Sequence, residues 1–155
     1  MTLPRRLQQM RRVRERIIER VAAAPVTHIH ISPFGYEWTV GHVLHHLIAS
    51  EQHFLTELAR NLPAKEPEPV IGFDALRAQD ARETLVACLL MQRAASCVLL
   101  AELSDAALAR PIAISSHPLL VGRSGFELLD FMTVHEDRHG QEIDEILARA
   151  AAPGA

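Results

Sequence analysis

Two histidines four residues apart interrupt an apolar stripe in the stretch FELLDFMTVHEDRHGQEIDEIL, residues 126–147. At 100° per residue, one narrow arc of a helix holds Leu128, Met132, His135, His139, Ile143 and Ile146. The pattern predicts an amphipathic helix with two imidazoles on its core-facing side. Because burying unpaired polar groups costs free energy, the imidazoles need hydrogen-bond acceptors or a metal ion. Histidines spaced i,i+4 can both reach one ion from a single helix face.

The rest of the chain also has helical periodicity. A first helix is predicted over residues 4–24, where Pro25 stops it. A second follows a cap at Thr39 and ends before Pro63. A third spans about residues 74–108, either continuous or broken near Asp80.

The helix that carries the two histidines opens with a capping box formed by Ser124 and Glu127. The preceding segment, PIAISSHPLLVGR, is short and β-prone, so we expect at most a small hairpin or an extended crossover there. Four amphipathic helices of this length predict an all-α fold, an antiparallel four-helix bundle with a long crossover between the third and fourth helices. The length favours a single domain over residues 1–155.

A metal held by two histidines of one helix needs a ligand from another helix. The second helix offers WTVGHVLHHLIASEQHFL, with His42, His45, His46 and His53. On a helical wheel, His45 lies nearly opposite the apolar stripe, where we expect it to be solvated. His46 is nearest the stripe and is the best candidate, ranked modestly above His42.

Three elements of this sequence occur in the same order in a known family. They are Trp38-Thr39, the pair His46-Leu47 eight residues after the Trp, and the HxxxH of His135 and His139. In these elements the chain resembles the DinB/YfiT-like superfamily. The resemblance implies a four-helix bundle and a homodimer. It also implies a divalent-metal site, for zinc, nickel or a similar ion, with His46, His135 and His139 as ligands.

Two features depart from the simplest form of that family pattern. Gln141 follows the last histidine by two residues, where the family often has three, which puts a role for Gln141 in doubt. His42 and His46 are themselves spaced i,i+4, so a four-histidine or two-metal variant, as in hemerythrin-like bundles, stays open. Against that variant, the carboxylates such bundles need are missing from the matching positions.

Three neutral imidazoles leave at least one coordination position open. Such a site supports hydrolysis by activated water or polarisation of a substrate oxygen, and equally the activation of a thiolate. The resemblance favours the thiol: it implies transfer of a low-molecular-weight thiol cofactor onto a small electrophilic substrate. A metal-dependent hydrolase and a non-catalytic metal-binding stress-response protein are the alternatives.

Weaker site candidates surround the proposed ligands. Glu51 lies on the apolar stripe of the second helix, as a partner that orients a histidine, a general base, or a carboxylate that reaches an arginine in a subunit interface. Tyr36 and Trp38 precede the ligand helix and are candidates to line the mouth of the site, although a Trp that caps the core is at least as plausible. Arg138 is a candidate for binding an anionic substrate, or is simply solvated.

Other polar residues receive no role at this stage. The loop histidines are His28, His30 and His117. Three acidic residues of the last helix are expected at the surface, namely Asp130, Glu136 and Asp137.

Composition limits the partners and the compartment. The formal net charge is −3, and the arginines of the first helix spread over several faces without interleaved aromatic residues. A solvated outer face is therefore favoured over nucleic-acid binding. Cys88 and Cys97 are too far apart along one helix for a disulfide, which favours reduced thiols and a cytoplasmic protein. The apolar run LVACLLM meets Gln92 and Arg93 well short of a membrane span, and no signal peptide is visible.

Overall fold

The computed structural model describes residues 1–33, 35–62, 75–113, 115 and 117–152, and these residues are mostly helical, with no strand. Four long helices dominate: α1 (Leu3–Ala23), α2 (Val40–Asn61), α3 (Arg82–Ala101) and α5 (Gly125–Ala150). The connections contain a short 3-10 segment, η1 (Val26–His28), and a one-turn helix, α4 (Asp105–Leu108). The all-α prediction is confirmed for this part of the chain.

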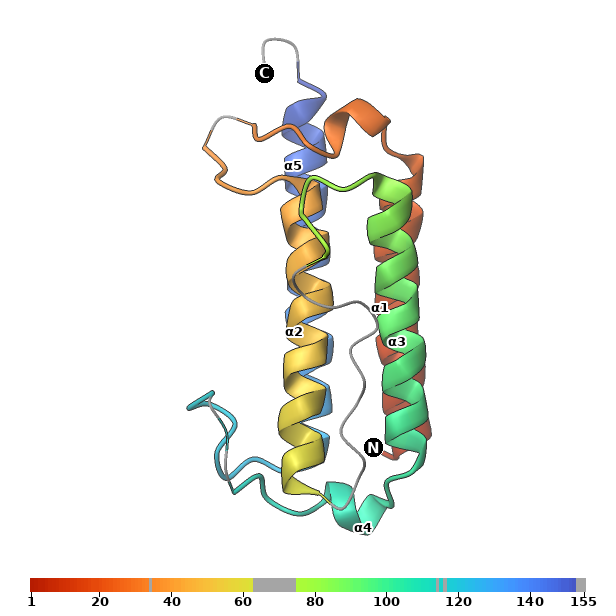
Figure 1. The fold of residues 1–155 in the computed structure, drawn as a ribbon, viewed down its shortest axis with the longest axis vertical. Helices are drawn as coiled ribbons and strands as arrows, with labels where there is room; N and C mark the ends of the chain where they lie inside the picture. Colours follow the sequence, from red (N-terminus) through yellow and green to blue (C-terminus); the bar gives the residue numbers. More distant parts are fainter. Residues whose placement is uncertain (34, 63–74, 114, 116, 153–155) are drawn as a thin grey trace.

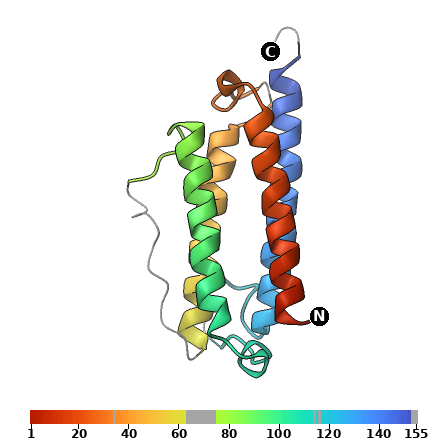
Figure 2. The ribbon, with the colours of Figure 1, turned by 90° about the vertical axis from the view of Figure 1, so that its right-hand side faces the viewer.

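The four long helices lie side by side (Figure 1). α1 packs mainly on α5 and α3 mainly on α2, while α2 also packs on α5. The colours in Figures 1 and 2 show that α1 and α5 run in one direction and that α2 and α3 run in the other. The pairs α1–α5 and α2–α3 are therefore parallel, unlike the alternating antiparallel order expected from the sequence.

The position of the lengthwise crossover also differs from the expectation. α2 ends at one end of the molecule and α3 starts at the other, so the connection that runs the length of the bundle lies between α2 and α3 (Figure 1). α3 ends at the same end of the molecule at which α5 begins. The physical reason lies in the start of the third helix. α3 begins at Arg82, because the described residues before it form turns, one of them closed by the Asp80 carboxylate accepting from the Arg77 amide at 2.8 Å. The longer connection removes the constraint that makes briefly linked helices antiparallel.

The other helix boundaries follow local chemistry. The predicted start of the third helix at Asp74 lies outside the described residues. Its predicted end at Leu108 includes α4, a separate turn capped by the Ser104 side chain. Between α4 and α5, Ile112 exchanges backbone hydrogen bonds with Arg123 and Gly122, beside an isolated bridge from Pro111 to Ser124. Among the described residues, this isolated bridge stands in place of the expected hairpin.

Both predicted caps form. Thr39 accepts a hydrogen bond from the His42 amide, and the His42 ring accepts one from the Thr39 amide, so histidine takes the place of the usual glutamate in this capping box. Ser124 and Glu127 form the second box at the start of α5. These caps fix where α2 and α5 begin, and therefore which way their histidines point.

Two apolar clusters fill the interior, one toward each end of the helices. One is built around Leu58, Leu100 and Leu128, and the other around Leu44, Leu89 and Ile143. Buried charged residues lie along the helices between them. By length and composition alone, α3 is the one helix of the described chain that could cross a membrane, with a mean hydropathy of 1.8 in its most apolar window.

Candidate metal centre

The three predicted ligand histidines converge although they come from two helices. His46 projects from α2, and His135 and His139 from successive turns of α5. One ring nitrogen from each lies within 4.8 Å of the others, and all three side chains are half-buried. The ring centroids of His135 and His139 are 4.6 Å apart, and that of His46 is 4.7 Å from His139.

The spacing of the nitrogen atoms suits a metal ion. The Nε2 atoms of His46 and His135 are 3.3 Å apart. Two nitrogen ligands about 2.0–2.1 Å from a tetrahedral zinc ion are separated by about 3.3–3.4 Å. The side chains therefore already have the separation that a shared divalent ion would impose. A hydrogen bond between two imidazoles would join only two of the three rings.

The surroundings of His135 and His46 favour their neutral forms. Burial, together with the neighbouring His139 and His46, lowers the pKa of His135 to about 4. Burial and His139 lower the pKa of His46 as well. Neutral imidazole is the form that coordinates metals, so protons compete weakly for the nitrogen atoms of His46 and His135 at neutral pH.

One of the three histidines has an orienting partner. The Glu142 carboxylate lies 2.7 Å from Nδ1 of His139, one helical turn along α5. A carboxylate on Nδ1 fixes the tautomer that leaves Nε2 free for a metal, as ligating histidines usually require. Inspection of the sequence missed Glu142, although its i+3 spacing from His139 was the available signal.

Of the two aromatic residues that precede α2, Trp38 contacts the histidine cluster and Tyr36 binds residues of α5 near it. The Trp38 ring lies 5.1 Å from His46 and stacks at 6.2 Å against His139. Tyr36 donates its hydroxyl hydrogen bond to Glu145, which raises the pKa of Tyr36, and the Arg149 guanidinium lies over its ring.

A cavity opens beside the cluster. Its volume is about 530 Å³, and its lining residues are Tyr36, His135, Arg138, His139, Gln141, Glu142 and Glu145. The predicted mouth residue Tyr36 and the predicted anion ligand Arg138 thus share one cavity with two of the three histidines. Gln141 also lines it and binds Asp137 at 3.4 Å.

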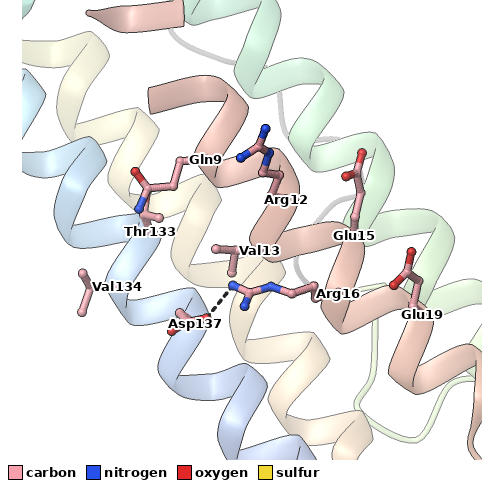
Figure 3. Close-up of a pocket in the computed structure, with 9 residues that line it drawn as sticks. All are labelled: Gln9, Arg12, Val13, Glu15, Arg16, Glu19, Thr133, Val134 and Asp137. Atoms are coloured by element: carbon pink, nitrogen blue, oxygen red, sulfur yellow. Dashed lines mark hydrogen bonds and ion pairs between the residues drawn. The ribbon is translucent and has the colours of Figure 1, made fainter. Parts of the chain in front are cut away.

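A hollow of similar size lies elsewhere, between the outer sides of α1 and α5. Figure 3 shows its lining, which includes Arg12, Glu15, Val134 and the ion pair between Arg16 and Asp137. No histidine of the cluster borders it.

Glu51 does not join the histidines. Its carboxylate accepts from Arg14 at 2.6 Å and from Arg93 at 2.9 and 3.1 Å, and also from Ser96. The same two arginines bind Glu136. We name Arg14, Glu51, Arg93 and Glu136 the buried charge quartet, since each comes from a different long helix and each is 3–9% exposed.

The quartet corrects two expectations. Glu136 is buried, not at the surface, because both arginines neutralise it. Arg14 is likewise inside, so the arginines of α1 are not all on a solvated face. One of the roles considered for Glu51 was a carboxylate that reaches an arginine in a subunit interface. Glu51 does bind arginines, but they belong to its own chain. The two arginines and the Ser96 hydroxyl bring the pKa of Glu51 to about 2 despite its burial.

The remaining histidines occupy other environments. His42 serves the α2 cap, and His53 is exposed beside Phe54. Neither belongs to the three-histidine group found among the described residues. His45 is half-buried and not fully solvated as expected. His117, given no role from the sequence, lies about 6.1 Å from both Phe54 and Phe131, which in turn flank His135.

Comparison with known proteins bears on the same three positions. The family model of the DinB superfamily matches residues 9–143. The chain belongs to the DinB superfamily. The match includes His46, His135 and His139, so the DinB region contains the whole histidine cluster. No curated protein and no solved structure matches the chain.

Proposed function

We propose that this DinB protein is a four-helix bundle that binds one divalent transition metal ion, zinc or nickel, through His46, His135 and His139. We further propose that it transfers a low-molecular-weight thiol onto a small electrophile. The observation that carries the metal proposal is the convergence of three imidazoles, with a 3.3 Å separation between two Nε2 atoms. The cavity beside them supports the second part, because a site for small molecules must be open.

The side chains around the cluster have distinct tasks in this proposal. Glu142 holds His139 in the ligating tautomer, and Trp38 shields two of the histidine rings from water. Arg138, exposed at the cavity, binds an anionic group of the thiol or the electrophile. When bound, the metal supplies Lewis acidity that makes a thiol a stronger acid.

Elemental analysis of untagged protein tests the metal site. We expect near one ion per chain in the parent and loss of the ion in His46→Ala and in His135→Ala. His53→Ala is the matched control, because His53 is on α2 but outside the cluster, and it should keep the ion. A parent without metal even after incubation with zinc or nickel would contradict the proposal.

Turnover tests the reaction. Metal-loaded protein should consume a thiol together with an electrophile, and chelation should stop the reaction. Arg138→Ala should raise KM more than it lowers kcat, since Arg138 is placed to bind and not to react. Metal-dependent ester or amide cleavage without thiol consumption would favour the hydrolase. Full metal occupancy without turnover of any substrate would favour a non-catalytic stress-response role.

A further inference from the structure

A hollow of about 390 Å³ lies between α5 and the turns that precede it. Its apolar lining residues are Leu119, Leu120, Phe131 and Val134, and we name it the apolar hollow. The hollow between α1 and α5 differs, because charged and polar side chains make up most of its lining (Figure 3). Sites for small molecules are mostly apolar and have volumes of about 300–1,000 Å³. The apolar hollow has the size and lining of a site for part of a small molecule.

Three charged residues complete the lining of the apolar hollow, and each is paired within the chain. The Asp130 carboxylate accepts from two nitrogen atoms of Arg6, at 2.7 and 2.9 Å. The Glu127 carboxylate accepts from Arg123 at 3.2 Å and from the Ser124 amide at 2.8 Å. A charged ligand group would have to compete with these partners for each charge. The pairing therefore favours an uncharged group in the apolar hollow.

Backbone hydrogen bonds fix the outer wall of the apolar hollow. The Leu120 amide donates to the His117 carbonyl at 3.0 Å, and the Gly122 amide donates to the Ile112 carbonyl at 2.8 Å. The Leu120 side chain is 2% exposed and packs in the core, whereas the neighbouring Leu119 side chain is 67% exposed. The fold thus holds a large apolar side chain at the hollow without burying it.

Two consecutive turns of α5 join the apolar hollow to the histidine cluster. The Phe131 ring lines the hollow and stacks against the His135 ring, with 6.0 Å between the centroids. Val134 also lines the hollow, and Arg138, four residues later, lines the cavity beside the histidines. Residues four apart lie on the same side of a helix, about 6 Å apart along its axis. The apolar hollow and that cavity therefore follow each other along one side of α5.

We infer that the apolar hollow binds an uncharged hydrocarbon group of the small molecule whose reactive end occupies the cavity beside the histidine cluster. The inference rests on the proposed function, because it assigns part of the substrate of the same site. Every residue that lines the cavity has a polar or charged side chain, which suits a hydrophilic thiol. The apolar hollow suits the other reactant, so the electrophile carries an alkyl or aryl group beside its reactive carbon.

Binding of straight-chain hydroxamic acids tests the inference without turnover, since their head group chelates divalent metal ions. Zinc-loaded parent is titrated calorimetrically with the series from acetohydroxamic to octanohydroxamic acid. Once the chain reaches the apolar hollow, each added methylene should tighten binding by up to about fourfold, the gain from burying one methylene completely.

Leu119→Asp should abolish this dependence on chain length, because a carboxylate would replace the exposed apolar wall of the hollow. Val121→Asp is the matched control, since Val121 is 52% exposed on the same turns but does not line the hollow, and this variant should keep the dependence. Circular dichroism and zinc content should be unchanged in both variants.

Several outcomes would overturn the inference. They are an affinity that does not change with chain length in the zinc-loaded parent, an equal dependence in the parent and in Leu119→Asp, and a dependence that Val121→Asp also abolishes. An affinity independent of chain length, together with a parent whose sedimentation mass exceeds that of Leu119→Asp, would assign the apolar hollow to a second protein chain instead.

Failure of the proposed function can be distinguished from failure of this inference. If the parent holds zinc but turns over no electrophile, the hydroxamic acid series still decides whether the apolar hollow binds the hydrocarbon group. If the parent holds no metal, the uncharged fluorophore N-phenyl-1-naphthylamine is titrated into the metal-free protein. Saturable binding that Leu119→Asp removes and Val121→Asp retains would support an apolar ligand site, and a parent that does not bind the fluorophore would overturn it.

Discussion

Two polar clusters lie inside this protein, and they are built on opposite principles. The buried charge quartet joins two arginines and two glutamates, one from each long helix, and its charges cancel. The histidine cluster joins three imidazoles from two helices, and the Nε2 atoms of two of them are 3.3 Å apart. The quartet is electrically complete within the chain, whereas the histidine cluster has basic nitrogen atoms directed at a common point.

The two clusters show that buried polar groups can have either a structural or a ligand-binding role, depending on whether they pair with one another. Polar groups that satisfy one another can hold a bundle together without any ligand. Three imidazoles that converge cannot all satisfy one another, because a hydrogen bond between His46 and His135 joins only two of them, and a ligand from outside the chain can join all three. A cavity of about 10 Å³, enough for about one water, separates the two clusters and is lined by both His135 and Glu136. The buried charge quartet therefore packs next to the histidine cluster, on the side where His135 lies.

Breaking the quartet should have the largest effect on stability. Arg93→Met leaves Glu51 and Glu136 with half of their compensating charge, and we expect a loss of about 3–5 kcal/mol in the free energy of unfolding. Urea denaturation of the metal-free protein measures it. Arg16→Met is the control, since Arg16 binds Asp137 at the surface and should contribute about 0–1 kcal/mol. Equal losses in both variants would mean that the buried charge quartet stabilises the fold no more than a surface ion pair does.

The buried charge quartet should lose its stabilising effect only at low pH. The pKa of Glu51 is about 2 in the folded protein, below the ordinary value of 4.5, because Arg14 and Arg93 face it and Glu136 shares their charge. Between these values the unfolded chain binds more protons at this site. Its stabilising contribution is therefore complete above about pH 4.5 and is lost as the pH falls toward 2. Carbon-13 NMR should show the Glu51 carboxylate still ionised at pH 4; a midpoint near 4.5 would contradict this pairing.

Metal should stabilise the protein only through the incomplete cluster. At a free zinc concentration one hundred times Kd, we expect about 2.7 kcal/mol of added stability, which corresponds to a rise in Tm of about 5–10 °C for a chain of this size. His135→Ala should show no such rise, and Arg16→Met should show the full one. Thermal unfolding with and without zinc makes the comparison. A similar rise in His135→Ala would place the ion elsewhere.

The sequence predicted the histidine cluster well because its signal is local. The i,i+4 spacing places His135 and His139 on one face of a helix. On α2 the helical wheel ranked His46 only modestly above His42, and the resemblance to the DinB/YfiT-like superfamily pointed to His46. The quartet has no such signal, since each helix contributes only one charge to it. A lone Arg14 among the arginines of α1, or Glu136 between His135 and Asp137, looks like any surface charge.

The direction of the helices was also beyond the sequence. Periodicity gave the approximate position of each long helix, and the sequence also indicated a cap at Thr39 and the Ser124–Glu127 capping box. Periodicity does not fix the order of the helices in space. The direction of α3 relative to α2 depends on where α3 begins. Residues 75–81 form turns, but their apolar residues are equally compatible with a helix, so the sequence did not locate the start of α3. His117 reached the neighbourhood of His135 through a loop, where no periodicity exists to predict it.

The smallest expected effect concerns two glutamates beside the histidine cluster, which should differ in their influence on zinc affinity. Glu142 and Glu145 both line the cavity from α5, but Glu142 binds His139 and Glu145 binds Tyr36. Glu142→Gln should weaken zinc affinity about 10–100-fold, because Nδ1 of His139 loses its carboxylate partner. Glu145→Gln should leave the affinity within a factor of about 3, an allowance of about 0.6 kcal/mol for the lost cavity charge. Competition with a chromogenic chelator measures both. If the two variants bound zinc equally, Glu142 would be one more acidic side chain at the cavity, and the histidines alone would define the site.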